Sequence, residues 1–476
     1  MINLVRNELC KLLHKKAIYV YLVIAVLLLF LTSFAIKSFD EAVDYELSAD
    51  IIEESLDTFD LSNPSELSYY IGDRVLVDQY RLLAKYGDET PEGYYIYETI
   101  VPLIHSKYEA EYSTKDKELA KEIQKDIDRQ IKLLDNFDWK KIVKDERKAL
   151  LEQIKVVEEV YNKNKKDETL KLELDTLNIH LWCLDYRLEN NVPYTNKVDS
   201  NMIDQYEDYA VQYLSMVKDE KLLNSKEKII QKREVESNYY TLLHKLENKD
   251  INENQELIDY VIESFKYVDG FIVIGIIIIC GSIISEEFNK GTIKQLLIKP
   301  FSRSKILTSK IIASLIVILL FLFVYETAFL LVNCYEYSDF TSIFGNTVVY
   351  DYTSNSVREV SVLGTCLYGF VSMLPAYLII FGVVILVGVL STSSVATICS
   401  GFGVFIGGDL ITMWLTPKIV SYLPFFCWDL SSYMFGGLNP NKYASFGKSI
   451  VVDIITLVGL FVVSYILFNK KEIKNQ

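Results

Sequence analysis

Long apolar runs divide this chain into membrane-sized segments separated by polar connections. A helix needs about 20 mainly apolar residues to cross the hydrocarbon core of a bilayer. Runs of this kind, completed by neighbouring residues where they are short, predict transmembrane helices at 17–36, 266–285, 306–332, 362–390, 393–415 and 449–468. The other segments are 1–16, 37–265, 286–305, 333–361, 416–448 and 469–476.

The first sixteen residues have the pattern of a helix that lies at a membrane surface. Apolar side chains share one helical face and basic side chains are available to lipid phosphates: Ile2, Val5, Leu9 and Leu12 against Arg6, Lys11, Lys15 and Lys16. The alternative is a signal peptide, because Ser33-Phe34-Ala35 resembles a small-residue cleavage site. The apolar run at 17–36 is too long for a signal peptide core, which favours a retained span.

The polar segment 37–265 has a strongly helical pattern. Its clearest helix carries leucines that step by four and three residues and stop before Asn190-Asn191-Val192-Pro193: Leu170, Leu174, Leu177, Leu181, Leu184 and Leu188. The polar stretch at 162–167 separates this helix from the preceding one, which predicts an antiparallel hairpin. At the end of the segment, Ile258 to Phe265 runs without a breaker into the span at 266–285, so we expect one continuous helix there.

Charge is distributed unevenly between the polar segment and the rest of the chain. Residues 37–265 contain 31 Lys and Arg against 51 Asp and Glu, whereas the remainder contains 18 against 13. Basic segments mark the cytoplasmic side of a membrane protein. We therefore expect both termini and the 286–305 loop inside, and a large acidic domain outside a bacterial plasma membrane. A net-acidic exterior argues against nucleic acid as a partner.

The loop at 286–305 has an internal order of its own. Gly291 supplies a joint and Thr292 an N-cap. Ile293, Leu296 and Leu297 then share the apolar face of a short helix that Pro300 ends. A rigid apolar-faced helix held between two spans predicts a contact with a cytoplasmic partner.

These residues resemble a known family of membrane proteins. The run formed by Glu287, Gly291, Thr292, Ile293, Lys294, Leu296, Leu297, Pro300, Ser302, Arg303 and Lys310 is similar to the loop between the second and third spans of ABC exporter permeases of the six-helix type V fold. The resemblance covers about 25 residues closely and the six-span topology loosely. The alternative is an ordinary basic loop that obeys only the positive-inside rule.

The resemblance implies an all-α membrane protein with six transmembrane helices and an inserted, mostly helical extracellular domain. In that family the loop carries a coupling helix that docks into a separate ATP-binding subunit, so ATP and Mg would belong to that partner. The family also implies a second permease copy or a sister permease beside this chain in the lipid bilayer. Short extracellular helices that dip toward the membrane are expected at 416–448.

Two carboxylates inside predicted spans are candidates for a functional role. Placing the charged side chain of Glu326 or Asp409 in hydrocarbon costs free energy, so such groups usually face the bundle interior or a watery cavity. The alternative for each is a carboxylate that reaches the membrane interface. Four glycines in the fifth span would permit close helix approach: Gly401, Gly403, Gly407 and Gly408.

Signals for catalysis or cofactor binding are weak. Gly447-Lys448-Ser449 imitates the end of a phosphate-binding loop, but Lys442 stands where its first glycine is required. His180 and Cys183 have the spacing of a helical metal pair, yet two ligands do not make a zinc site. We therefore expect no enzyme activity and no cofactor or metal in this chain.

The sequence thus predicts a permease subunit of an ABC exporter that moves an amphipathic peptide or lipid-like substrate. The alternative is a non-transporting transmitter, in which ATP-driven motion makes the extracellular domain act on a cell-envelope partner. Recognition by that domain would favour cationic ligands, because its net charge is strongly negative.

Overall fold

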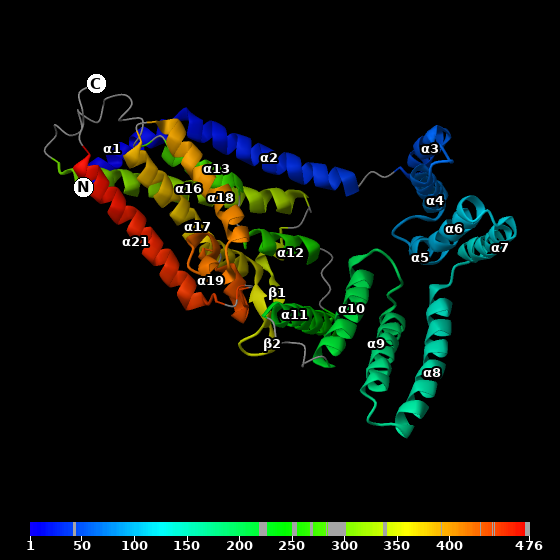
Figure 1. The fold of residues 1–476 in the computed structure, drawn as a ribbon. Helices are drawn as coiled ribbons and strands as arrows, with labels where there is room; N and C mark the ends of the chain where they lie inside the picture. The colour runs from blue at the N-terminus through cyan, green and yellow to red at the C-terminus, as the bar shows by residue number, and fades with distance from the viewer. Residues whose placement is uncertain are drawn as a thin grey trace. The chain divides into compact units, whose positions relative to one another are not determined.

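The protein, described here from a computed structural model, is mostly helical (Figure 1). The structure describes residues 1–40, 44–218, 226–249, 255–266, 270–281, 283, 301–336, 340–391, 393–428, 430–439, 441 and 443–471. Their contacts divide the chain into two units. An apolar-helix unit comprises Met1–Lys37, Asn224–Ile230 and Asn254–Gln476, and a polar unit comprises Ser38–Leu223 and Gln231–Glu253.

Long apolar helices dominate the apolar-helix unit. Its larger helices are α1 (Ile2–Leu13), α2 (Lys16–Asp40), α12 (Gln255–Ser264), α13 (Gly270–Gly281), α16 (Arg303–Glu336), α17 (Val362–Leu390), α18 (Ser394–Trp414) and α21 (Phe446–Lys470). Short helices follow α18, as expected for residues 416–448: α19 (Pro417–Val420), α20 (Pro424–Cys427) and the 3-10 turn η6 (Ser431–Gly436).

Three of the described helices are long and apolar enough to cross a membrane, namely α16, α17 and α21. Helices α1 and α2 form a fourth candidate if they make one span bent by 57°, and α13 and α18 are shorter apolar helices. The protein is therefore a mostly helical, membrane-associated protein. The six-span topology stays a prediction.

Helix α13 packs against both α16 and α17, and these three helices contribute most of the core of this unit. Close approach depends on glycine at a few positions. A Cβ on Gly401 would lie 2.7 Å from the side chain of Ile277, and one on Gly408 would lie 2.7 Å from the ring of Phe425. A Cβ on Gly403 or Gly407 would meet nothing within 4 Å, so only two of the four fifth-span glycines serve packing among the described residues.

One β-hairpin interrupts the helical architecture. The strands β1 (Asn346–Asp351) and β2 (Ser356–Ser361) pair antiparallel, with Asn346 opposite Ser361. Between them, Asp351 accepts hydrogen bonds from the backbone N–H and the hydroxyl of Thr353 and thereby stabilises the turn. The 3-10 turn η5 (Ser342–Phe344) precedes the hairpin. The expected all-α class therefore holds with this one exception in the described chain.

The predicted continuity between α12 and the next span is wrong. Helix α12 ends at Ser264, and Phe265 and Lys266 form a turn in which the Lys266 N–H donates to the Glu263 carbonyl at 2.9 Å. The hydroxyl of Ser431 donates to the Lys266 carbonyl at 3.1 Å, which supplies a partner for a helix-terminal acceptor. Leu257, Ile258 and Val261 of α12 pack in the apolar-helix unit.

Amphipathic helices build the polar unit (Figure 1). They are α3 (Tyr45–Ser55), η1 (Leu56–Thr58), α4 (Pro64–Tyr86), α5 (Pro91–Tyr95), η2 (Ile96–Ile100), α6 (Val101–Tyr108), η3 (Glu109–Ser113), α7 (Lys117–Leu134), α8 (Trp139–Lys163), α9 (Glu168–Asn190), α10 (Val198–Lys218) and α11 (Lys226–Asn248). The predicted hairpin is confirmed, because leucines of α9 pack against Val143, Leu150 and Ile154 of α8. Asn191 ends α9 in the left-handed conformation (φ 59°), which suits asparagine.

Candidate functional site

Most of the predicted docking loop lies outside the described residues. This applies to Glu287, Gly291, Thr292, Ile293, Lys294, Leu296, Leu297 and Pro300, so their roles stay predictions. Arg303 is described, and it opens α16 directly after the loop. The structure therefore describes the base of the loop, where the chain enters the helix bundle.

Arg303 and Ser304 join the beginning of α16 to the end of α21. The Arg303 guanidinium donates from Nη1 to the carbonyls of Asn469 (3.1 Å) and Lys471 (2.9 Å). The Ser304 hydroxyl and the Asn469 amide are joined by hydrogen bonds of 3.0 and 3.2 Å. A cation at the last carbonyls of a helix satisfies acceptors that the helix itself leaves unpaired. These contacts fix the two helix ends to one another.

Further hydrogen bonds join α21 to α16 and to the end of α17. Thr308 and Tyr465 share a hydrogen bond of 2.6 Å between their hydroxyls. The Lys471 ammonium donates to the carbonyl of Leu390 at 3.3 Å and also to that of Val389, at the end of α17. Burial lowers the pKa of Lys471. The ends of α17 and α21 are thus held together beside the beginning of α16.

A buried ion pair connects α16 to the N-terminal helix. Lys310 donates from Nζ to Glu8 Oε2 at 2.7 Å, and their side chains are only 1% and 6% exposed. Lys11 binds the other carboxylate oxygen of Glu8 at 2.7 Å. Each oxygen of Glu8 therefore has a cationic partner. We call Glu8, Arg303, Ser304, Thr308, Lys310, Tyr465, Asn469 and Lys471 the loop-base network.

The structure changes the interpretation of the N-terminal helix. The buried face of α1 is formed by Leu4, Glu8 and Leu12, whereas Ile2 is exposed. Lys11, expected to be available to lipid phosphates, binds Glu8 instead. Sequence analysis missed Glu8, although an acidic residue one turn from both Leu4 and Leu12 was a signal that this face meets a cation.

The two carboxylates predicted inside spans lie on different helices. Glu326 is half-buried in α16 and lies close enough to Cys366 of α17 for the two groups to interact electrostatically. Asp409 belongs to α18, and its side chain lies outside the described residues. The functional role predicted for each stays a prediction.

Sequence analysis missed a third carboxylate in an apolar helix. Asp453 of α21 is 3% exposed, and neither carboxylate oxygen has a hydrogen-bond partner among the described residues. The rule that selected Glu326 and Asp409 also selects Asp453, because it is the acidic residue of the predicted span 449–468.

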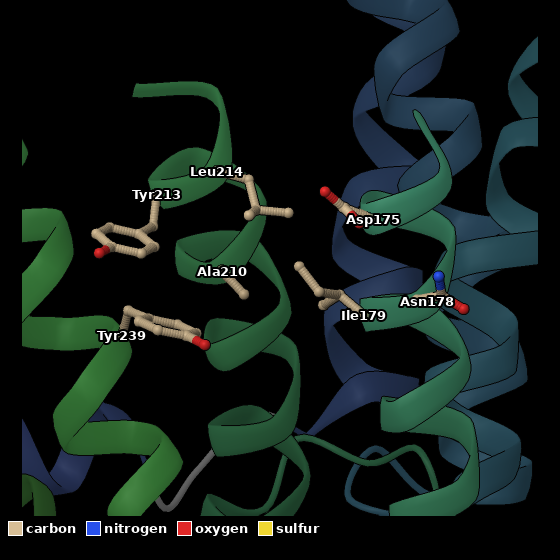
Figure 2. Close-up of a pocket in the computed structure, with 7 residues that line it drawn as sticks. All are labelled: Asp175, Asn178, Ile179, Ala210, Tyr213, Leu214 and Tyr239. Carbon is tan, nitrogen blue, oxygen red and sulfur yellow. The ribbon is translucent and has the colours of Figure 1, made fainter. Parts of the chain in front are cut away.

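A cavity of about 420 Å³ lies within the polar unit, at α9, α10 and α11 (Figure 2). Its apolar lining comes from Ile179, Ala210 and Leu214, and the carboxylate of Asp175 points toward Leu214 in this view. Asn178, Tyr213 and Tyr239 complete the lining, and the two tyrosine rings stack with centroids 5.0 Å apart. A hydrogen bond with Tyr240 raises the pKa of Tyr213. The cavity therefore offers a carboxylate, neutral aromatic rings and an apolar wall.

His180 and Cys183 have structural partners in the same unit. His180 Nδ1 lies 2.6 Å from Glu207 Oε1, and this hydrogen bond raises the pKa of His180. Cys183 is buried, which raises its pKa. The residues that the structure describes contain no group of three potential metal ligands.

Arg187, near the end of α9, binds a carboxylate and a hydroxyl group of α10. Arg187, 1% exposed, donates to the Ser200 hydroxyl at 3.0 Å and to Asp204 at 2.5 Å. Its guanidinium lies 3.9 Å from the ring centroid of Tyr194. These bonds join the end of α9 to the beginning of α10, so we assign Arg187 to the folding of the unit.

Comparison with known proteins places the chain in a family. Residues 222–474 match the family described as "Protein of unknown function (DUF2705)". A relative from Bacillus subtilis (strain 168), the "Uncharacterized protein YhcI", is 30% identical over 210 residues. That alignment covers 42% of this chain and 64% of the relative, so the chain spans less than two thirds of its length. No solved structure matches. Because the family match covers more than half of the chain, the protein belongs to the DUF2705 family.

Proposed function

We propose that this protein is the membrane-spanning permease subunit of an ABC transporter. In this proposal a separate subunit hydrolyses ATP and pushes on the 286–305 loop, and the spans rearrange in response. The observation that carries the proposal is the loop-base network. The first two turns of α16 are bonded to α1 through Glu8 and to α21 through Asn469 and Tyr465.

This arrangement suits the transmission of a force. A displacement of the loop would act on α16 first, and the buried ion pair and hydrogen bonds would carry it to α1 and α21. Lys471 would extend it to α17. Packed interiors are dense and transmit strain, so a push at one end is not absorbed locally.

The resemblance of 285–310 to the coupling loop of ABC exporter permeases supports the same proposal. Ile293, Leu296 and Leu297 would form the apolar face that the ATP-binding subunit covers, with ATP and Mg bound by that subunit. A second permease copy or a sister permease would complete the assembly. The six spans would consist of α2, α13, α16, α17, α18 and α21, with α1 lying at the cytoplasmic membrane surface.

The polar unit would then lie outside the cell and recognise the cargo. A pocket with a carboxylate, two tyrosine rings and an apolar wall suits a ligand that combines a cation with an apolar group. An amphipathic peptide or a lipid-like molecule has this character. Export of such a substrate is the direction that the resemblance favours.

Thiol labelling of intact cells tests the topology. Lys165→Cys lies in the turn between α8 and α9 and should react with a membrane-impermeant reagent. Lys294→Cys should react only after the cells are permeabilised. Labelling in the reverse order would rule out the proposed orientation.

The docking proposal is tested with the variant L296D/L297D. Two aspartates at a packed apolar interface would leave unpaired charges buried, and we expect a loss of several kcal/mol of binding free energy. The variant should insert into the membrane normally but no longer co-purify with an ATP-binding subunit in mild detergent. The matched control is Leu133→Asp, since Leu133 is exposed in the polar unit. Normal co-purification of L296D/L297D would refute the docking role.

Reconstituted vesicles separate export from the transmitter alternative. An exporter should accumulate an amphipathic cationic peptide in an ATP-dependent manner when the ATPase partner is present. A transmitter would hydrolyse ATP without moving the peptide. ATP turnover with no transport of any amphipathic substrate would favour the transmitter.

A further inference from the structure

Asp453 stands apart from the other buried charged groups of the apolar-helix unit. Asp453 is 3% exposed. Both of its carboxylate oxygens are fully buried, and neither has a hydrogen-bond donor among the described residues. Glu8, in the same unit, has a cation on each oxygen.

One short helix, α20, covers this part of α21. Helix α20 contacts α21, and its Cys427 and the adjacent Trp428 are buried. Phe425 of α20 lies against Gly408 of α18, where a Cβ would come within 2.7 Å of its ring. Asp453 is seven residues from Phe446, which is about 10 Å along a helix that rises 1.5 Å per residue. The carboxylate is therefore near one end of α21, close to Cys427 of α20.

Polar neighbours of Asp453 are directed to other partners. Lys448 donates from Nζ to the Ser421 hydroxyl (2.6 Å) and to the Tyr443 carbonyl (3.1 Å). The Ser449 hydroxyl shares a hydrogen bond of 3.3 Å with that of Tyr433. The Cys427 thiol donates to the Ser421 carbonyl at 3.5 Å. The titratable groups that face this site from α20, η6 and α21 are thus already engaged.

An unpaired carboxylate is unfavourable in such surroundings. Burial of an isolated ion is so costly that a group of this kind normally becomes neutral instead. Neutralisation requires a bound proton, since no cation or donor compensates the charge in the described surroundings. Opening of the cover would admit water, which solvates the ionised form.

We propose that Asp453 is a proton-binding site controlled by the α20 cover. With the cover closed, Asp453 is a neutral carboxylic acid. When the cover opens, its O–H bond breaks, the proton passes to water, and the carboxylate stays on α21. By linkage, acidic conditions favour the closed cover and alkaline conditions favour the open one. This inference does not depend on the ABC assembly, because it uses only groups of this chain.

Infrared difference spectroscopy of the full-length protein in detergent tests the protonation state. At neutral pH, the difference between wild type and D453N should contain the carbonyl band of a protonated carboxylic acid. The variant D453E keeps the proton site and should shift this band without removing it. Identical acid-carbonyl spectra for wild type and D453N would show that Asp453 is ionised and would overturn the proposal.

An alternative to proton binding is an ion pair between Asp453 and Lys442, a residue that lies outside the described residues. If Lys442 neutralised Asp453, the band would be absent from the wild type and would appear in K442Q. That result would replace proton binding by an ion pair. If the band is present in both proteins, proton binding stands.

The role of the cover is tested by the labelling of native Cys427 with a thiol reagent, mapped by mass spectrometry. The labelling rate of Cys427 should rise between acidic and alkaline pH, and this rise should be several-fold larger in wild type than in D453N. The asparagine in D453N cannot ionise. G408A should displace Phe425 and raise labelling at every pH, whereas G407A, whose added Cβ meets nothing within 4 Å, should not. The same pH dependence in wild type and D453N would overturn the linkage to the cover.

Discussion

Two regions of the apolar-helix unit each bury an acidic side chain, and they differ in how the charge of that side chain is compensated. In the loop-base network, Glu8 binds Lys310 and Lys11, so its charge is fully compensated. Beneath α20, Asp453 has no partner among the described residues. A compensated charge fixes two helices in one arrangement, whereas an uncompensated one favours a change of protonation. The comparison teaches that burial alone does not assign a role to an ionisable group; its partners do.

The largest effect is expected from removal of one partner of the compensated pair. Lys310→Met leaves Glu8 buried with Lys11 alone, and breaking a buried ion pair costs about 3–5 kcal/mol. We expect a strongly reduced thermal midpoint in detergent and low membrane abundance. In the double variant E8L/K310M, both charges are gone, and most of the loss should be recovered. If K310M is as stable as wild type, the pair does not hold α1 to α16.

Lys11→Met is the matched control for this prediction. Lys11 also binds Glu8, but its side chain is 45% exposed. Exposed ion pairs contribute about 0–1 kcal/mol. A loss in K11M as large as that in K310M would contradict the assignment of Lys310 as the dominant partner.

A smaller effect is expected at the start of α16. Arg303→Ala removes two charge-assisted hydrogen bonds to the end of α21, which we expect to lower stability by about 2 kcal/mol. We expect a larger effect on coupling than on stability: ATP hydrolysis should continue, while the amount of substrate transported per ATP falls. The control is Lys305→Ala, an exposed basic residue of the same turn. Equal transport per ATP in wild type and R303A would remove Arg303 from the transmission path.

Sequence analysis predicted the boundaries of the apolar helices better than their contacts. The span predicted at 362–390 coincides with α17, since Ser361 caps its beginning and the apolar run ends at Leu390. The leucine stripe of α9 was recognised because both partners of the hairpin are adjacent in sequence. Lys310 and Glu8, in contrast, are 302 residues apart, and no periodicity relates them. The Figure 2 cavity was equally hidden, because three helices line it.

The substitution Asp453→Asn should change stability least among the buried charged positions. Asparagine has the shape of a protonated aspartate, so we expect a change of less than about 1 kcal/mol. Glu8→Gln removes a charge that two lysines compensate and should destabilise clearly more. Thermal midpoints of the two variants, measured side by side in detergent, check this contrast. If D453N proved as damaging as E8Q, Asp453 would have to be ionised and paired.

The role of Glu326 stays a prediction that a functional assay can sharpen. Glu326→Gln should alter transport, or its dependence on ATP, more than it alters membrane abundance, as expected for an interior carboxylate. Activity per molecule, measured at equal abundance, is the relevant quantity. Unchanged activity would leave Glu326 as an interface-level carboxylate.

The smallest effect concerns a charged pair in the polar unit. The hydrogen bond with Glu207 raises the pKa of His180, so its contribution to stability is present below about pH 6.5 and is lost as the pH rises through the folded-state pKa. Glu207→Gln should therefore lower the unfolding midpoint more at acidic than at alkaline pH. The control is Glu109→Gln, whose carboxylate lies 3.8 Å from His105 in an exposed pair. An effect of E207Q that did not vary with pH would contradict the assignment.

The central claim is that the 286–305 loop docks into an ATP-binding subunit, and photo-crosslinking in living cells tests it most directly. A photoreactive amino acid at Leu297 should crosslink to a protein that carries a nucleotide-binding motif, identified by mass spectrometry. The same amino acid at Lys165 of the polar unit should not crosslink to that protein. The account predicts a crosslink to an ATPase from Leu297 alone. A crosslink from Leu297 to an envelope protein, or none to any ATPase, would contradict it.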